Sequence, residues 1–259
     1  MNKLVIFITH FLFISMTTTF NYSIVLADIN QNLIAYFPFN GNANDESGNN
    51  NHGEIYGAIE VPDRFGNKNG AFSFDGTDDY ISIKNSEFFS PWMDDYSIVF
   101  WLRVPNDGNY NKIFMIESGL HFVQLIQGDP TESPETIRFG MKSGTHDSAV
   151  LTTTELVKDY KWHFVVGVRE NVNTVKLYID GKFKSESTNI NLGDVQTSEV
   201  SYLYIGYDPL RLIAYKGDID EIRIYNRALS ALEIQQLFTY DELIQSGYKI
   251  GLNAGKKSC

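Results

Sequence analysis

Short stretches of alternating apolar and polar residues recur along most of the chain. Residues 33–39 are mostly apolar but include Pro38, which favours an edge strand. Residues 97–104 are apolar on both faces, which is typical of a central strand covered on two sides. Residues 162–168 and 201–207 read as further strands. The pattern predicts an all-β fold in which two antiparallel sheets pack as a sandwich.

Two Asp-Gly pairs mark predicted tight turns. Residues 70–83 read as a strand, a turn at Asp75-Gly76 and a second strand, with apolar residues sharing one face of each strand. A later strand ends at Asp180-Gly181, which is a strong hairpin signal. Both sites are therefore expected to connect strands by hairpins.

Residues 217–230 combine acidic and aliphatic residues in one predicted strand. With a period of two, its faces are Asp218, Asp220, Ile222 and Ile224 against Ile219, Glu221, Arg223 and Tyr225. If the isoleucines at 222 and 224 enter a core, Asp220 is carried toward it. A metal ion, an arginine or a catalytic partner is then needed to hold the Asp220 carboxylate.

A short helix is predicted directly after this strand. Ser230 and Glu233 have the spacing of a capping box, in which each residue bonds the other's backbone N–H. Leu229 and Ile234 have the spacing of a hydrophobic staple. The helix is therefore expected to dock its first turn against the sandwich.

Residues 217–230 resemble the closing strand of laminin-G-like (concanavalin A-like) jelly-roll domains, with their Ile-Asp pair and YNRALS ending. Residues 70–83 resemble a hallmark segment of the same family, as does Trp162-His163 followed by the strand that ends in Asp-Gly. The resemblance covers residues 33–238. It implies a two-sheet antiparallel jelly-roll sandwich with a short C-terminal helix, used for carbohydrate recognition or adhesion.

The loop after the first strand is rich in side-chain oxygen. Asn40, Asn42, Asn44 and Asp45 are hard donors of the type that calcium prefers, although Asn and Gly are equally common in ordinary loops. The resemblance implies that this loop helps to hold a structural calcium ion. The predicted ligands of that ion are Asn40, Asn42, Asp45, Asp75 and Asp220.

The composition of the chain narrows the classes of molecule that it is expected to bind. The chain has 259 residues and a formal net charge of −11, without a basic stripe for nucleic acid. Its single cysteine, Cys259, excludes an internal disulfide. A charged start, an apolar run and a small-residue cleavage site make residues 1–27 a predicted secretory signal.

These features divide the chain into three predicted parts. Residues 1–27 are the signal, residues 28–239 the jelly-roll domain, and residues 240–259 a tail that is helical or frayed. The mature chain is expected to be secreted to the extracellular space, the periplasm or the cell surface, without a membrane span.

Catalysis is not expected. Asp218 and Asp220 share a predicted face, with carboxyls about 6 to 7 Å apart, a separation that does not exclude glycoside hydrolysis. However, the jelly-roll glucanases that this would resemble carry glutamates on a central strand lined by tryptophans. The histidines also lack metal-ligand spacing, and no nucleophile elbow is present.

Binding is the expected role. Trp92, Tyr110, Tyr207 and Tyr215 fall in loops or at strand ends, where aromatic rings can serve as platforms for sugars. The loosely patterned middle third of the chain is expected to supply the binding surface. The predicted ligand is a glycan or extracellular polysaccharide. The alternatives are an extracellular protein ligand or a purely structural role.

Overall fold

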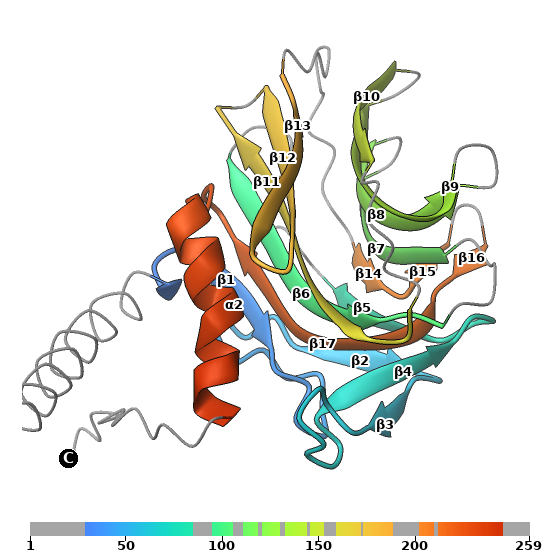
Figure 1. The fold of residues 1–259 in the computed structure, drawn as a ribbon. Coiled ribbons are helices and arrows are strands. Elements are labelled where there is room, and N and C mark those ends of the chain that lie inside the picture. Colours follow the sequence, from blue (N-terminus) through green and yellow to red (C-terminus); the bar gives the residue numbers. More distant parts are fainter. Residues whose placement is uncertain are drawn as a thin grey trace, which may run out of the picture.

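Figure 1 shows the fold as a computed structural model. The structure describes residues 29–84, 95–105, 111–118, 121–129, 133–143, 146–152, 159–171, 173–188, 202–209 and 212–245. Within these residues the chain forms two large antiparallel sheets, a two-stranded ribbon and a helix, α2 (Ala231–Gln245). The predicted two-sheet sandwich with a C-terminal helix is confirmed.

One sheet has eight strands. Its order is β13 (Lys182–Ser187), β12 (Thr174–Ile179), β11 (Trp162–Glu170), β6 (Tyr96–Arg103), β17 (Lys216–Tyr225), β4 (Ala71–Asp75) and β3 (Ile59–Val61), with β1 (Leu33–Phe37) paired to β17. The strand predicted as central, β6, lies between β11 and β17. Pro38 directly follows β1, whose recorded partner is β17.

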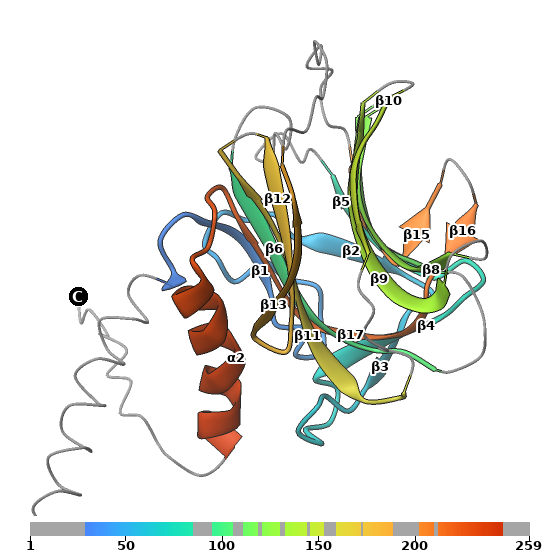
Figure 2. The ribbon, with the colours of Figure 1, turned by 45° about the horizontal axis from the view of Figure 1, so that its top comes forward.

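The other sheet has seven strands. Its order is β10 (His146–Thr152), β9 (Ser133–Ser143), β8 (His121–Asp129), β7 (Asn111–Ser118), β14 (Tyr202–Ile205), β5 (Tyr80–Lys84) and β2 (Gly53–Tyr56). A ribbon of β15 (Tyr207–Asp208) and β16 (Ile213–Ala214) stands beside this sheet (Figures 1 and 2).

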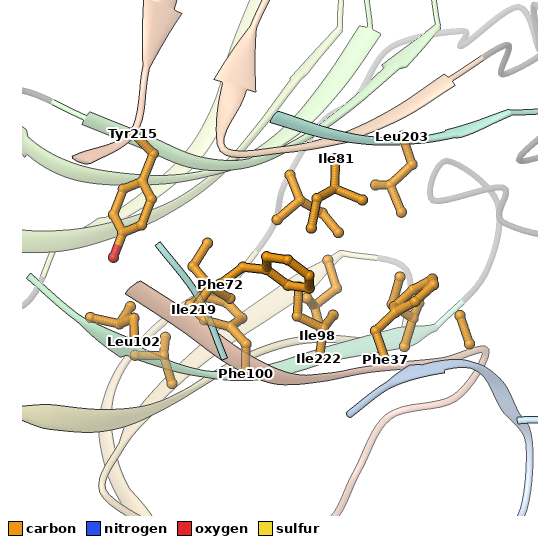
Figure 3. Packing of buried hydrophobic residues seen from close by; sticks show 14 of the residues in the cluster. Phe37, Phe72, Ile81, Ile98, Phe100, Leu102, Leu203, Tyr215, Ile219 and Ile222 are labelled. Carbon is orange, nitrogen blue, oxygen red and sulfur yellow. The ribbon is translucent and has the colours of Figure 1, made fainter. Parts of the chain in front are cut away.

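The main core fills the space between the two sheets. Figure 3 shows Phe72 and Phe100 of the eight-stranded sheet facing Ile81 and Leu203 of the seven-stranded sheet. Each of these side chains is at most 1% exposed. Burying such a side chain contributes about 1.5–3 kcal/mol, so this layer supplies much of the drive for folding.

The Asp75-Gly76 turn does not form the predicted hairpin. β4 ends at Asp75 in one sheet, whereas β5 begins at Tyr80 in the other, so the turn carries the chain across the sandwich. The prediction was wrong because both strands point alternate apolar residues at the same core, and alternation does not specify the sheet. Asp180-Gly181 does connect the paired strands β12 and β13, with both residues at positive φ.

β17 contains a bulge that reverses its alternation. Between Asp220 and Arg223 the pairing with β6 shifts, and Glu221 has φ 51°. The partner strand on the other side changes here from β4, which pairs up to Ile219, to β1, which pairs from Ile222. Because one extra residue inverts the faces beyond it, the core-facing residues are Ile219, Ile222 and Ile224. The predicted placement of Asp220 toward the core was therefore wrong.

Helix α2 packs on the outer face of the eight-stranded sheet (Figures 1 and 2). A second apolar cluster forms there, where Ile234 and Leu237 meet Trp101 and Phe164. The predicted capping box is present: Ser230 N–H donates to Glu233 Oε2 at 2.8 Å, and Glu233 N–H donates to Ser230 Oγ at 3.3 Å. Among the described residues, no helix is both long and apolar enough to cross a membrane.

Helix α2 also spans the predicted boundary between the jelly-roll domain and the C-terminal tail, at residues 239 and 240. It continues through residues 239 and 240 and ends at Gln245, so the first part of the predicted tail is helical. The predicted signal, residues 1–27, and Cys259 lie outside the described residues.

Candidate functional site

Four tyrosines gather on the outer face of the seven-stranded sheet. Tyr80 alternates along β5 with the core residues Ile81 and Ile83, so its ring points away from the core. Tyr56 lies directly opposite Tyr80 on β2. Tyr204 of β14 alternates with core residues in the same way. Together with Tyr207 of β15, these residues form what we call the tyrosine face.

The rings of the tyrosine face touch one another. Tyr56 and Tyr80 stack with centroids 4.5 Å apart and planes at 15°, and Tyr80 and Tyr207 stack at 5.7 Å and 24°. Tyr204 meets Tyr80 edge-on at 5.9 Å. Tyr56 is 42% exposed, and the other three are half-buried. The contacts hold the rings in place while leaving part of each phenol open to solvent.

Gly206 makes this arrangement possible. It lies between β14 and β15 with φ 87°, a conformation that side chains other than glycine rarely adopt. A Cβ atom there would also lie 2.5 Å from the Phe74 ring. The sharp turn at Gly206 separates β14 from β15 and lets Tyr207 fold against Tyr80.

Carboxylates border the tyrosine face. The Tyr56 hydroxyl donates to Glu54 Oε2 at 2.7 Å. The carboxylates of Asp75, Asp78 and Asp79, in the turn before Tyr80, lie within 4.8 Å of one another. We call Glu54 and these three aspartates the acidic rim.

Asp79 is the buried member of the acidic rim. Its Oδ2 accepts the Asp75 backbone N–H at 2.8 Å. Gly57 allows the carboxylate to approach the β2 end, since a Cβ there would lie 2.0 Å from Asp79 Oδ1. Burial raises the pKa of Asp79, and the charges of Asp75 and Asp78 act in the same direction. The rim is therefore a site where negative charge is already crowded.

The predicted calcium ligands do not come together. Asp45 is buried in its loop, and its oxygens accept backbone N–H groups from Tyr36, Ser47 and Asn51 at 2.9 Å each. Asn42 accepts the Asn44 N–H within the same loop. Protein donors thus occupy the Asp45 carboxylate, and this loop does not fit the predicted ion.

Two other predicted ligands have different surroundings. Asn40 is exposed, and its carbonyl accepts from the Asn42 amide at 3.2 Å. Asp75 belongs to the acidic rim. Among the residues that the structure describes, the three aspartates of the acidic rim are the one group of three or more acidic, histidine or cysteine side chains that lie close enough to share a cation.

Arg64 holds the fifth predicted ligand, Asp220. Their ion pair spans 2.6 Å, and the two side chains are 5% and 2% exposed. The guanidinium carbon lies 4.1 Å from the Phe65 ring centroid and 4.6 Å from that of Trp101. Of the three partners considered from the sequence, the structure shows the arginine.

The two acids considered for glycoside hydrolysis, Asp218 and Asp220, are both held in ion pairs. Asp218 Oδ2 accepts from Arg103 Nε and Nη2, both at 2.7 Å. Asp218 and Asp220 each hold an arginine on the outer face of β17. This arrangement explains the two carboxylates as ion-pair partners within the fold.

The four aromatic residues predicted as sugar platforms differ in where they lie. Tyr207 belongs to the tyrosine face. Tyr215 is fully buried in the main core (Figure 3), where its hydroxyl donates to the Asp218 carbonyl at 3.2 Å, so its predicted role in ligand binding was wrong. A strand-end position did not reveal that its ring turns inward. Trp92 and Tyr110 lie outside the described residues.

Sequence reasoning missed three members of the tyrosine face. Tyr56, Tyr80 and Tyr204 lie on strands, whereas the platforms predicted from the sequence were aromatic residues in loops or at strand ends. The available signal was alternation: Tyr80 and Tyr204 each sit out of phase with aliphatic residues that enter the core.

Comparison with protein families identifies the fold. The family model described as the concanavalin A-like lectin/glucanases superfamily matches residues 75–235. This match covers more than half of the chain, so the chain belongs to that superfamily.

A curated relative lies in a bacterial toxin. The chain is 21% identical over 207 residues to botulinum neurotoxin type F of Clostridium botulinum, which covers 75% of the chain and 16% of the toxin. The chain thus spans only a small part of that protein.

Solved structures share the fold. The binding domain of botulinum neurotoxin serotype D has a TM-score of 0.66 at 18% identity, covering 85% of this chain and 53% of that one. Domain 4 of AbnA, an extracellular arabinanase from Geobacillus stearothermophilus, was solved with arabinotriose. It has a TM-score of 0.63 at 22% identity, covering 79% of this chain and 97% of that one.

Proposed function

We propose that this chain is a secreted, non-catalytic carbohydrate-binding module whose glycan lies on the tyrosine face. The observation that carries the proposal is the stack of Tyr56, Tyr80 and Tyr207, which presents partly exposed phenols beside carboxylates. Aromatic rings can pack against the C–H faces of sugars, while phenols and carboxylates bond hydroxyl groups. The combination of apolar surface and a few polar groups is what a sugar requires.

The relatives support the coarse class of ligand. The AbnA domain was solved with arabinotriose, and a neurotoxin D ligand-binding domain with N-acetylneuraminic acid. Both are sugar complexes of chains with this fold. The predicted signal at residues 1–27 supports export, and the related AbnA domain comes from an extracellular enzyme.

Protein binding is the competing function. Ile55 of β2 and Ile59 of β3 are 38% and 65% exposed. Exposed apolar side chains are typical of protein-binding surfaces. A panel of glycans therefore has to be tested first.

The test is binding of the chain from residue 28 onward to a broad panel of immobilised polysaccharides and glycans. Tyr56→Ala and Tyr207→Ala each remove one ring, and each is expected to weaken binding about tenfold, or about 1.4 kcal/mol. Tyr160→Ala is the matched control, because Tyr160 is 61% exposed but contacts Arg103 of the other sheet.

Three results are informative. Binding that falls in both tyrosine-face variants, but not in Tyr160→Ala, supports the proposal. Equal binding by all variants places the glycan elsewhere on the molecule. Failure to bind any member of the panel favours the protein ligand.

Calcium remains a separate prediction. Titration calorimetry with calcium chloride tests it directly on the wild-type chain. Asp75→Asn combined with Asp78→Asn removes two of the three aspartates that could share a cation. Heat of binding that disappears in this double variant would place calcium at the acidic rim rather than in the Asn40 loop.

A further inference from the structure

We propose that the tyrosine face selects uncharged glycans and disfavours those that carry carboxylates. This inference rests on the proposed function and specifies its ligand class. It comes from the charges that surround the stacked rings in the described part of the chain, not from the rings themselves.

The carboxylates are next to the rings. Glu54 bonds the Tyr56 hydroxyl, and Asp79 directly precedes Tyr80. The absence of a side chain at Gly57 brings the Asp79 carboxylate against the backbone that follows Tyr56. Glu54 and Asp78 are exposed and can meet a ligand on the face.

The described cations near this face are less well placed. Lys84 lies on β5 four residues beyond Tyr80, about 13 Å along the strand, and opposite Tyr202, two residues from Tyr204. Its separation from Tyr80 exceeds the screening length of about 8 Å at physiological ionic strength, whereas Tyr204 lies nearer to Lys84. Lys216 lies beside Gly76 and pairs across the strands with Asp75, a member of the acidic rim. Among the residues that the structure describes, the charges nearest Tyr56 and Tyr80 are therefore negative.

A negative field discriminates between sugars of similar shape. A sugar hydroxyl can donate to Glu54 or Asp78, and hydrogen bonds to an ionised acceptor are the stronger kind. A sugar carboxylate offers no proton at neutral pH and is repelled at short range. The carboxylates of Asp75, Asp78 and Asp79 already lie within 4.8 Å of one another, and burial together with the charges of Asp75 and Asp78 raises the pKa of Asp79. Another negative charge would add to this repulsion.

The face suits a stretch of polysaccharide chain. Tyr56, Tyr80 and Tyr204 lie on three neighbouring strands, which places the outer rings about 10 Å apart. A row of this length spans more than one sugar ring. The inferred ligand is therefore a neutral polysaccharide or oligosaccharide, bound along its chain.

The experiment compares neutral and acidic polymers of matched backbone by affinity electrophoresis. The pairs are hydroxyethylcellulose with carboxymethylcellulose, and xylan with glucuronoxylan. We expect at least about tenfold tighter binding to a neutral member than to its acidic partner. The preference should weaken as salt is added, because salt screens exposed charges.

Charge-removing variants locate the effect. Glu54→Gln combined with Asp78→Asn keeps hydrogen-bonding groups at both exposed positions but removes two charges. It is expected to raise binding to the acidic polymers about tenfold relative to the neutral ones, and to weaken neutral binding because a neutral amide is a weaker hydrogen-bond acceptor than a carboxylate. Lys84→Gln, the matched control on β5, is expected to change neutral binding less than about threefold. Melting curves verify that each variant is folded.

The outcomes separate the two proposals. A neutral preference that narrows in the double variant supports the inference. Equal or tighter binding of wild type to the acidic polymers overturns the inference and leaves the carbohydrate-binding function intact. A preference that the double variant does not change also overturns it, because the rim would not be its cause. Failure to bind any pair overturns the proposed function and the inference with it.

Discussion

At the scale of single residues, an arginine holds the buried carboxylate of Asp220. Arg64 lies between the rings of Phe65 and Trp101 and holds the Asp220 carboxylate at 2.6 Å. Both charged side chains are almost fully buried. Removing one partner from such a pair is strongly destabilising because the other charge stays buried.

Asp220→Ala is therefore expected to lower the free energy of unfolding by about 3–5 kcal/mol, measured by urea denaturation. The loss should be the same in calcium and in chelator, because Arg64 and not an ion holds the carboxylate.

The matched control is the double variant Arg64→Met with Asp220→Leu, which removes both charges and keeps apolar volume. It should recover most of the lost stability. A loss of unfolding free energy in Asp220→Ala that appears only when calcium is present would contradict this account. It would indicate that calcium holds the Asp220 carboxylate.

The pKa of His163 depends on its position between two aspartates. Its ring nitrogens lie 2.9 Å from Asp180 Oδ2 and 3.1 Å from Asp159 Oδ1. Burial lowers the pKa of His163, but the two aspartates outweigh this effect and raise it above 6.5. Burial raises the pKa of Asp159, but hydrogen bonds from Lys161 and His163 outweigh that effect and lower it to about 2. Protonated His163 is thus favoured in the folded protein.

The stabilisation from His163 should depend on pH. Because the folded-state pKa is raised, the contribution is complete below about pH 6.5 and is lost as pH rises through the folded-state value. His163→Gln is expected to lower the melting temperature more at about pH 5.5 than at about pH 9. An equal loss at both pH values would show that the imidazolium is not the stabilising form.

At the scale of elements, helix α2 is stabilised by the capping box at its N-terminus and by the burial of its apolar face against the sheet. The Ser230–Glu233 box satisfies backbone donors of the first turn, and Leu229 and Ile234 are buried in the cluster beneath the helix. The helix forms here because local capping and tertiary burial agree.

Ile234→Ala is expected to cost about 2–5 kcal/mol of unfolding free energy, since the side chain is fully buried between helix and sheet. Leu232→Ala is the matched control on the same helix, because Leu232 is 67% exposed, and it should stay within about 0.5 kcal/mol of wild type. Similar losses in both variants would mean that α2 does not dock as described.

At the scale of the whole molecule, the candidate site combines distant parts of the chain. Tyr56, Tyr80, Tyr204 and Tyr207 meet because β5 lies between β2 and β14, and because Gly206 turns β15 toward them. The two acids once considered for catalysis lie instead on the outer face of the eight-stranded sheet, each with an arginine.

Incubation of the purified chain with the polysaccharides that it binds is therefore expected to release no reducing ends. Asp218 and Asp220 hold Arg103 and Arg64, and the tyrosine face lies on the other sheet. Release of reducing ends that Asp218→Asn abolishes would contradict this and favour the glycoside hydrolase alternative.

Features that depend on near neighbours along the chain follow from the sequence alone. Alternation predicts the strands because a side chain's face repeats every two residues. The helix cap at Ser230 and the hairpin at Asp180-Gly181 depend on residues only a few positions apart, and both are present. The resemblance added the jelly-roll topology, which the family match confirms.

Contacts between distant residues became evident from the three-dimensional structure. The bulge at Glu221 inverted the faces of β17, and Arg64 reached Asp220 across 156 positions of sequence. The tyrosine face likewise depends on the order of strands in the sheet. Alternation does not predict this order, because it indicates which face of a strand a residue occupies but not which strands lie next to each other. The core and the caps follow from local pattern, whereas the site follows from contacts between distant segments.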